Sequence, residues 1–137
     1  MSVKPEQFIT TAEKFFRVAS NEADYRCCIT RAYYGSYNAA IEYHGTLDRP
    51  GMSKANCGEH ENLIHKLQHP NIGNTDKNYL ISKELGRFLF KMRYQRVRSD
   101  YRLNETVTES DAKTTIAEAK IFINTISEVW LVNPIVI

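Results

Sequence analysis

Residues 22–45, with the sequence EADYRCCITRAYYGSYNAAIEYHG, decide the fold class of this chain. Small and apolar side chains recur there every three or four positions, the spacing that places them on one face of an α-helix. Asn21 is suited to cap the start of such a helix, and Gly45 is suited to end it. We therefore predict a helix from about Glu22 to His44. Its predicted inner face carries Tyr25, Cys28, Ile29, Ala32, Ser36, Ala40 and Tyr43.

The rest of the chain repeats this helical spacing, and no stretch alternates with a period of two for long enough to form a strand. Four other helices are predicted. They run from near Pro5 to the break at Ser20 and Asn21, from about Glu59 to Gln68, from just after Asn74 or Thr75 to between Arg98 and Leu103, and from the cap at Thr108 to a point before Asn133. Thr108 and Asp111 resemble a capping box for the last one. The sequence thus predicts an all-α bundle of five helices.

The first and last helices have well-marked apolar faces. The predicted inner positions are Phe8, Ala12, Phe15, Phe16 and Ala19 on the first, and Ala112, Ile116, Ala119, Ile123, Ile126 and Trp130 on the last. Residues 45–58 lie between the second and third helices and are rich in Gly, Pro, Asp, Ser and Asn. That composition predicts an exposed, mobile loop.

The composition fits a single domain over residues 1–137. With 42% hydrophobic residues the chain can form one core, and a formal net charge of +2 excludes a wholly basic nucleic-acid coat. No apolar run is long enough to span a membrane. The three cysteines, Cys27, Cys28 and Cys57, show no metal-binding spacing and fit a reducing cytoplasm. We expect a cytoplasmic protein with neither a metal site nor a cofactor.

The fourth helix carries an arginine on its apolar side. Leu85, Leu89 and Met92 define a stripe there, and Arg96 and Asp100 continue it towards the helix end. Burying an unpaired guanidinium is unfavourable. Either Asp100 therefore pairs with Arg96 for structural reasons, or the helix end opens into a cleft where Arg96 meets an anionic ligand. Both interpretations stay open on the sequence alone.

The opposite face of the same helix is basic. Arg87, Lys91, Arg98 and Arg102 share one narrow stripe, with Tyr94 among them. Such a strip can follow a phosphate backbone while the aromatic ring stacks on an unpaired base. The alternative is a solvated face with cations near the helix C-terminus, where they are favourable without a ligand.

Two further features stand out. Arg31, Tyr34 and Asn38 form a second face on the helix of residues 22–44, and tyrosine-bearing faces of this kind commonly pack against another helix or a second subunit. Together with Tyr33 they are the candidate residues of an interface or a cleft. His60 begins the short third helix on its apolar side. A histidine can transfer protons near neutral pH, so His60 becomes a catalytic candidate if it lies close to Arg96.

Three strings in this order resemble the HEPN superfamily, in its small standalone prokaryotic members: YRCCITRAYYGSYNAA (25–40), EHENLIHKL (59–67) and LGRFLFKMRYQRVRSDY (85–101). The resemblance spans roughly residues 8–126. Its most specific parts are Arg-x-Tyr-Tyr, matched by Arg31, Tyr33 and Tyr34, and Arg-x-x-x-Asp-Tyr, matched by Arg96, Asp100 and Tyr101.

The resemblance implies an antiparallel up-and-down helical bundle, often a homodimer. It links the chain to RNA cleavage, toxin–antitoxin pairs, phage defence or a nucleotidyltransferase partner. HEPN ribonucleases carry a histidine four to six residues after the arginine, and the cleft is metal-independent. Here Tyr101 stands at that position and no histidine follows His69. Because tyrosine has a pKa of about 10 it is a poor base, and His60 is the candidate replacement.

The leading hypothesis from the sequence is a homodimer that binds or cleaves RNA, with Arg96, Asp100, Tyr101 and His60 as site residues. The rival hypothesis is a noncatalytic immunity or antitoxin subunit, or a scaffold, that holds a protein partner through the face of Arg31. Binding of a nucleotide beside Arg96 is a third possibility.

Overall fold

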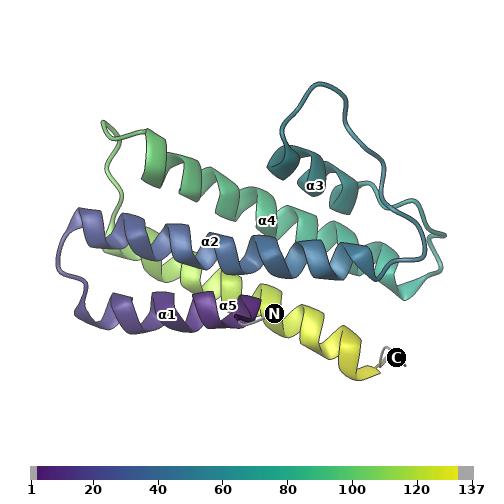
Figure 1. Cartoon of the computed structure of the whole chain (residues 1–137), viewed down its shortest axis with the longest axis horizontal. Coiled ribbons are helices and arrows are strands. Elements are labelled where there is room, and N and C mark those ends of the chain that lie inside the picture. The colour runs from purple at the N-terminus through teal and green to yellow at the C-terminus, as the bar shows by residue number, and fades with distance from the viewer. Residues whose placement is uncertain (1–2, 133–137) are drawn as a thin grey trace.

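The structure, a computed structural model, describes residues 3–132 and the side chains of residues 3–129. Five helices follow one another: α1 (Pro5–Val18), α2 (Glu22–Gly45), α3 (Glu59–Gln68), α4 (Lys77–Tyr101) and α5 (Glu109–Val132). Figure 1 shows α1, α2, α4 and α5 as a bundle in which consecutive long helices run antiparallel, with the short α3 lying on α4. The predicted all-α bundle of five helices is confirmed.

The core forms around α2, which contacts α1, α4 and α5. The predicted inner face of α2 is buried, apart from Tyr25, which is partly buried. The largest fully buried side chains come from α2 to α5 and the connection before α5, and they include Tyr33, Tyr43, Leu67, Leu85, Leu89, Met92, Val107 and Phe122. Because helices cover α2 on several sides, a wider part of its surface is buried than one stripe.

Two predicted inner faces need correction. Phe15 is 39% exposed, because it lies about 100° around α1 from Phe16, while Ile9 and Ala12 take the buried positions. On α5, Phe122 is fully buried although the prediction omitted it, and Ile123 is only partly buried. The predictions for the side chain of Trp130 and for Asn133 and Pro134 lie outside the described residues.

Side-chain caps define the helix starts as the sequence predicted. The side chain of Asn21 accepts a hydrogen bond of 2.9 Å from the N–H of Asp24. Thr108 and Asp111 form the reciprocal capping box, with side chain to backbone distances of 2.9 and 3.1 Å. The start of α4 differs slightly, because its N-cap is Asp76 and the helix begins later than predicted.

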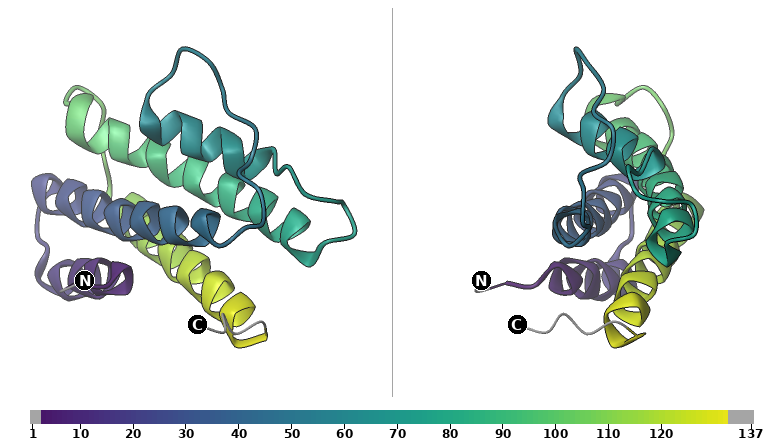
Figure 2. Two further views of the ribbon diagram at one scale, coloured as in Figure 1. Left: turned by 45° about the vertical axis from the view of Figure 1, so that its right-hand side comes forward. Right: turned by 90° about the vertical axis from the view of Figure 1, so that its right-hand side faces the viewer.

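The loop of residues 46–58 is largely exposed, as predicted, but it is tied to α2 and α3. The Gly51 N–H donates to His44 Nε2 at 3.0 Å, and the Met52 N–H donates to the carbonyl of His69 at 2.9 Å. Lys54 pairs with Glu61 at 2.6 Å. Figure 2 shows the loop arching beyond α3. These contacts fix where α3 begins, and the predicted mobility of the loop stays a prediction.

The short helix α3 lies very close to α4. A Cβ atom on Gly86 would come within 2.7 Å of Gln68 Cγ, so glycine is needed for this approach. The buried hydroxyl of Ser82 donates to the carbonyl of Leu67 at 2.7 Å. This packing carries the first turn of α3, with His60, to a position against α2.

The C-terminal end of α4 is held by Arg26, a buried residue of α2. Its guanidinium donates to the carbonyls of Arg98 at 2.8 Å, of Ser99 at 3.0 Å, and of Glu105. Carbonyls at this end of a helix have no partner within the helix. Arg26 therefore supplies the missing donors and fixes the turn that precedes the loop to α5.

Candidate functional site

Arg96 lies on the inner side of α4 near the end of the helix, and its side chain is only 17% exposed. Its Nε lies 3.0 Å from Asp100 Oδ2, on the residue four positions later. The other oxygen of this carboxylate accepts a hydrogen bond of 2.6 Å from Thr30 Oγ1 on α2. The predicted pairing of Arg96 with Asp100 is confirmed, and Thr30 orients the carboxylate.

Tyr33 and Tyr101 both contact the guanidinium of Arg96. Its Cζ lies 6.0 Å from the centre of the Tyr33 ring and 5.2 Å from that of Tyr101. Tyr33 is fully buried, and burial raises the pKa of its hydroxyl above the ordinary value. Tyr101 is 67% exposed. Tyr33 therefore belongs to the floor of the site, whereas Tyr101 is accessible to a ligand of Arg96.

His60 and Arg96 both lie against Tyr33, and the charge of Arg96 acts on the histidine. It stacks on Tyr37 with ring centres 3.9 Å apart, and its Nδ1 is 2.7 Å from the hydroxyl of Tyr33. Burial lowers the pKa of His60, and the positive charges of Arg96 and Arg93 lower it further. The imidazole is therefore predominantly neutral at pH 7.

The hydrogen bond to Tyr33 determines which nitrogen of His60 carries the proton. A buried hydroxyl needs an acceptor, and His60 Nδ1 is the hydrogen-bond partner of the Tyr33 hydroxyl within residues 3–132. Tyr33 therefore donates to Nδ1, and we assign the proton of the neutral ring to Nε2. Neutral His60 thus offers an N–H donor, which suits binding an anion better than accepting a proton.

Arg93 is a site residue that the sequence analysis missed. It lies on α4 three positions before Arg96, so the two side chains are neighbours on the helix surface. Its buried Nε has no hydrogen-bond partner among the described residues, and no ion pair to a described carboxylate is present. The positive charge of Arg93 also lowers the pKa of His60, less than burial and the charge of Arg96 do. The three-residue spacing between Arg93 and Arg96 was the sequence feature that could have identified Arg93 as a neighbour of Arg96.

We call these five residues the arginine site: Tyr33, His60, Arg93, Arg96 and Asp100. The Nε of Arg96 has Asp100 as its ion-pair partner at 3.0 Å, whereas the buried Nε of Arg93 has no hydrogen-bond partner among the described residues. Arg96 pairs with Asp100, and the positive charge of Arg93 contributes to lowering the pKa of Glu61 on α3. Glu59 also acts on His60, from the exposed first turn of α3. The arrangement offers donors and positive charge to an anion.

The basic strip predicted on the opposite face of α4 is present, but carboxylates pair with each of its members. Arg87 pairs with Glu84 at 2.5 Å, Lys91 with Glu118 at 3.6 Å, and Arg102 with Glu105 at 3.6 Å; Arg98 pairs with Glu105 at 3.2 Å and with Asp111 at 3.7 Å. Tyr94 lies beneath the cations of Arg98 and Arg102. The side chain of Arg98 is only 14% exposed and also donates to the carbonyl of Thr106, so this member of the strip holds the loop before α5. A role of the strip in nucleic-acid binding stays a prediction.

The second face predicted on α2 is only partly a surface. Arg31 and Tyr34 are exposed, and Asn38 is partly buried with its amide donating to the carbonyl of Tyr34 at 2.8 Å. Tyr33, which the prediction grouped with them, is fully buried because the first turn of α3 covers it. It belongs to the arginine site and not to an interface.

A groove of about 370 Å³ opens beside the arginine site. It lies between Cys27, Thr30 and Arg31 on α2 and Ser99 and Asp100 on α4. Asp100 thus belongs both to the groove and to the arginine site.

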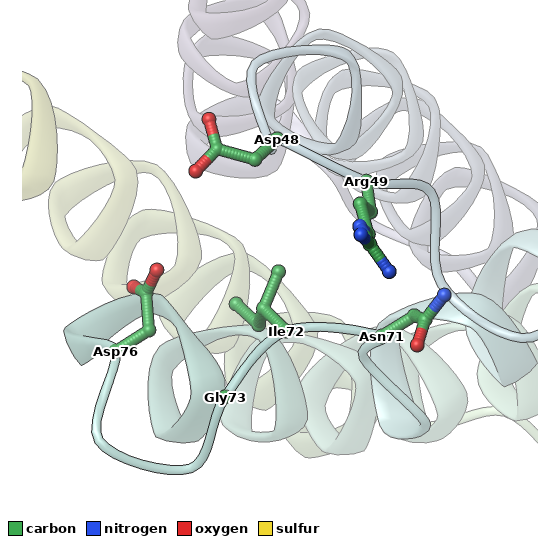
Figure 3. A pocket seen from close by; sticks show the side chains of 6 residues that line it. All are labelled: Asp48, Arg49, Asn71, Ile72, Gly73 and Asp76. Carbon is green, nitrogen blue, oxygen red and sulfur yellow. The ribbon is translucent and has the colours of Figure 1, made fainter.

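A second pocket, of about 350 Å³, lies away from these residues, between the loops that precede α3 and α4. Figure 3 shows the carboxylates of Asp48 and Asp76 on one side and the side chains of Arg49 and Asn71 on the other. Asp76 has a structural role there, because its Oδ1 accepts the N–H of Asn78 at the start of α4 at 2.8 Å. None of the lining residues belongs to the arginine site.

The described residues offer neither a metal centre nor a membrane span. No cluster of three or more His, Cys, Asp or Glu side chains suited to a metal ion occurs in the part of the chain that the structure describes. The described helices also include none with the length and apolar content needed to cross a membrane.

Comparisons of the chain with family models, with curated proteins and with solved structures give no match. The resemblance to the HEPN superfamily therefore rests on the motifs of residues 25–40, 59–67 and 85–101 and stays a prediction.

Proposed function

We propose that the chain binds single-stranded RNA through a backbone phosphate held at the arginine site. One observation carries this proposal: two partly buried arginines, Arg96 and Arg93, lie close enough to His60 for their charges to lower its pKa, and the Nε of Arg93 has no hydrogen-bond partner among the described residues. Guanidinium groups recognise phosphate through charge and through paired hydrogen bonds. Exposed aromatic rings such as Tyr101 add a surface on which unpaired bases stack.

The proposal favours binding over cleavage. Cleavage at a ribose hydroxyl needs a group that accepts its proton, and Tyr101 is the residue found where a ribonuclease of the HEPN type has histidine. His60 is close enough to matter, but Tyr33 occupies the lone pair of its Nδ1 and leaves Nε2 protonated. We include in the proposal the toxin–antitoxin or defence setting, the homodimer, the cytoplasmic location and a cognate toxin, antitoxin or nucleotidyltransferase partner that the HEPN resemblance implies.

Binding is tested with a fluorescently labelled all-uridine oligonucleotide, whose anisotropy is followed over a range of salt concentrations. Wild type is expected to bind, with an affinity that falls as salt rises. Arg96→Gln and Arg93→Gln should each weaken binding and flatten the salt dependence, by about 0.7 in the slope of log K against log salt for each phosphate that is no longer neutralised. Lys14→Gln, an exposed cation on α1, is the control and should leave both quantities unchanged.

Two results would count against the proposal. Wild-type affinity in the Arg96→Gln protein would show that the site does not hold the phosphate. Cleavage of the oligonucleotide in the presence of a chelator, abolished by Arg96→Gln, would show that the site is a catalytic one and that the assigned His60 tautomer is wrong.

A second candidate function is protein binding through α2. Tyr34 is 39% and Ile41 is 46% exposed, and the two lie seven residues apart on the face that also carries Arg31. Exposed aromatic and aliphatic side chains aligned with an arginine are typical of interface anchors. Tyr34→Glu should release a protein that co-purifies with the chain at fixed stoichiometry while RNA binding persists. Retention of the partner by this variant would exclude the α2 face.

A further inference from the structure

The groove beside the arginine site has a wall of mixed chemistry that the phosphate-binding proposal does not use. Its volume of about 370 Å³ lies at the lower end of the range of roughly 300–1,000 Å³ that is usual for small-molecule sites. A space of this size admits one nucleobase but not a helix of a partner protein. Because Asp100 also pairs with Arg96, a base in the groove would be a direct neighbour of a phosphate at the arginine site.

The carboxylate of Asp100 is the recognition group of the groove. Its side chain is 29% exposed, and its two oxygens contact Thr30 Oγ1 and Arg96 Nε. A carboxylate has about four lone-pair positions, so each oxygen keeps one acceptor position free after these contacts. Thr30 and Arg96 fix the plane of the group, which makes it a rigid pair of acceptors.

The opposite wall offers a stacking surface. Arg31 is exposed at the edge of the groove on α2, one residue after Thr30. The planar guanidinium of arginine stacks on nucleobases in single-stranded RNA. The groove therefore combines a flat cationic side with a fixed pair of acceptors.

A pair of acceptors selects among the four bases. Guanine alone carries two adjacent donors on its Watson–Crick edge, the ring N1–H and the exocyclic amino group. Adenine and cytosine place an amino donor next to a ring acceptor, and uracil places one N–H between two carbonyls. A carboxylate that accepts both guanine donors would meet a repelling lone pair on each of the other bases.

We infer that this groove binds a guanine base of single-stranded RNA, with Asp100 as the residue that specifies it. The inference rests on the proposed function, because it places the guanine next to the phosphate held by Arg93 and Arg96. It adds the base preference and assigns to Asp100 a role in recognition besides its role in orienting Arg96.

The test compares the all-uridine oligonucleotide with the same oligonucleotide carrying one central guanosine, again by anisotropy with the full chain. A two-bond contact to a base should raise the affinity of wild type for the guanosine oligonucleotide by roughly 5-fold or more. In Asp100→Asn the side chain has one acceptor and one donor group, so this advantage should disappear. Because Asp100 also pairs with Arg96, the readout is the ratio of the affinities for the two oligonucleotides within each variant and not the affinity for either one alone.

Matched variants separate recognition from structure. Asp48→Asn changes an aspartate in the other pocket and should retain the full guanosine advantage. Thr30→Val keeps the carboxylate but removes the hydroxyl that orients it, so the advantage should shrink without a loss of uridine binding. Thermal unfolding by circular dichroism checks that each variant is folded; if Asp100→Asn is not, the Thr30→Val result decides.

The experiment distinguishes failure of the guanine inference from failure of the proposed function. If wild type binds both oligonucleotides equally while Arg96→Gln weakens both, the proposed function stands and the guanine inference is overturned. Equal weakening of both oligonucleotides by Asp100→Asn would show that Asp100 only positions Arg96, and this also overturns the inference. No effect of Arg96→Gln on either oligonucleotide would remove the proposed function and the inference together.

Discussion

Replacing Arg26 by methionine is expected to be the most destabilising of the single substitutions considered for this bundle. Methionine keeps most of the buried stem of the side chain but removes the guanidinium. The carbonyls of Ser99 and Glu105 then lose their side-chain donor at the end of α4, while those of Arg98 and Arg102 each keep one backbone N–H. Because α2 covers this end of the helix, water replaces the missing donors incompletely.

The size of the effect follows from these contacts. A hydrogen bond from a charged donor contributes about 1.5–3 kcal/mol, and a buried polar group left unsatisfied costs about 1–3 kcal/mol. Arg26 donates to four carbonyls, two of which also accept a backbone N–H, and it lies at the edge of the core where some rehydration is available, so we expect a loss of roughly 3–5 kcal/mol. That is a large part of the total stability of about 5–15 kcal/mol usual for a domain. The melting temperature should fall by roughly 10–20 °C.

Urea unfolding followed by circular dichroism measures this loss as a shift of the midpoint. Arg26→Lys retains the charge but has one compact donor group in place of the planar fork, so it should lie between Arg26→Met and wild type. Arg17→Met, on an exposed residue of α1, should change the free energy of unfolding by less than about 0.5 kcal/mol. A loss below about 1 kcal/mol in Arg26→Met would refute the reasoning, since it would mean that water satisfies these carbonyls as well as Arg26 does.

Three further predictions concern other parts of the molecule. Gly86→Ala should destabilise the protein by about 1–3 kcal/mol, because the new Cβ meets Gln68. Gly45→Ala has no neighbour near the new Cβ and should stabilise the protein by up to about 1 kcal/mol. Urea midpoints measure both changes, and equal effects of the two substitutions would contradict the close approach of α3 to α4. Burial, and then Lys66, lower the pKa of His44, so its contribution to stability is complete above a pH of about 6.5 and is lost as the pH falls towards the lowered pKa. His44→Gln keeps an acceptor for the Gly51 N–H but does not titrate, so this variant should lose less stability than wild type on acidification. His60, whose pKa is also lowered, accounts for part of the loss that remains. If stability depends on pH in the same way in the variant and in wild type, His44 is excluded as a cause of the acid-dependent loss. Arg93→Met should leave the free energy of unfolding unchanged or raise it by up to about 1 kcal/mol, because it removes a buried Nε without a partner, and a clear loss of stability would show that Arg93 holds the fold.

Features of neighbouring residues in the sequence were sufficient to predict where the helices lie. The caps at Asn21 and Thr108 and the break before Glu22 are chemical features of adjacent residues, so the bounds of α2 and the start of α5 followed directly. The pairing of Arg96 with Asp100 was predictable for the same reason, since four residues along a helix bring two side chains together.

The parts of the site that the sequence did not reveal depend on where α3 lies. Tyr33 reads as a surface residue as long as α2 is taken alone, and it becomes buried because α3 brings His60 onto it. Arg93 lies at an angle between the apolar stripe and the basic face of α4, so its role shows only once α3 is in place. Likewise, no spacing within α2 indicates that Arg26 reaches the end of α4.

The arginine site makes better sense as a place for a ligand than as a stabilising element of the bundle. Arg96 and Asp100 alone would be a neutral pair, held by Thr30, and such a pair needs no ligand. Arg93 adds a second cation near His60, whose pKa it lowers, and its buried Nε has no hydrogen-bond partner among the described residues, although Glu61 also lies close enough to feel its charge. We expect Arg93 to contribute little to the free energy of unfolding, and a buried cation of this kind fits a site that binds an anion. Loss of RNA binding by Arg93→Gln, together with unimpaired stability of Arg93→Met, is therefore the combination that separates a binding site from an internal ion pair.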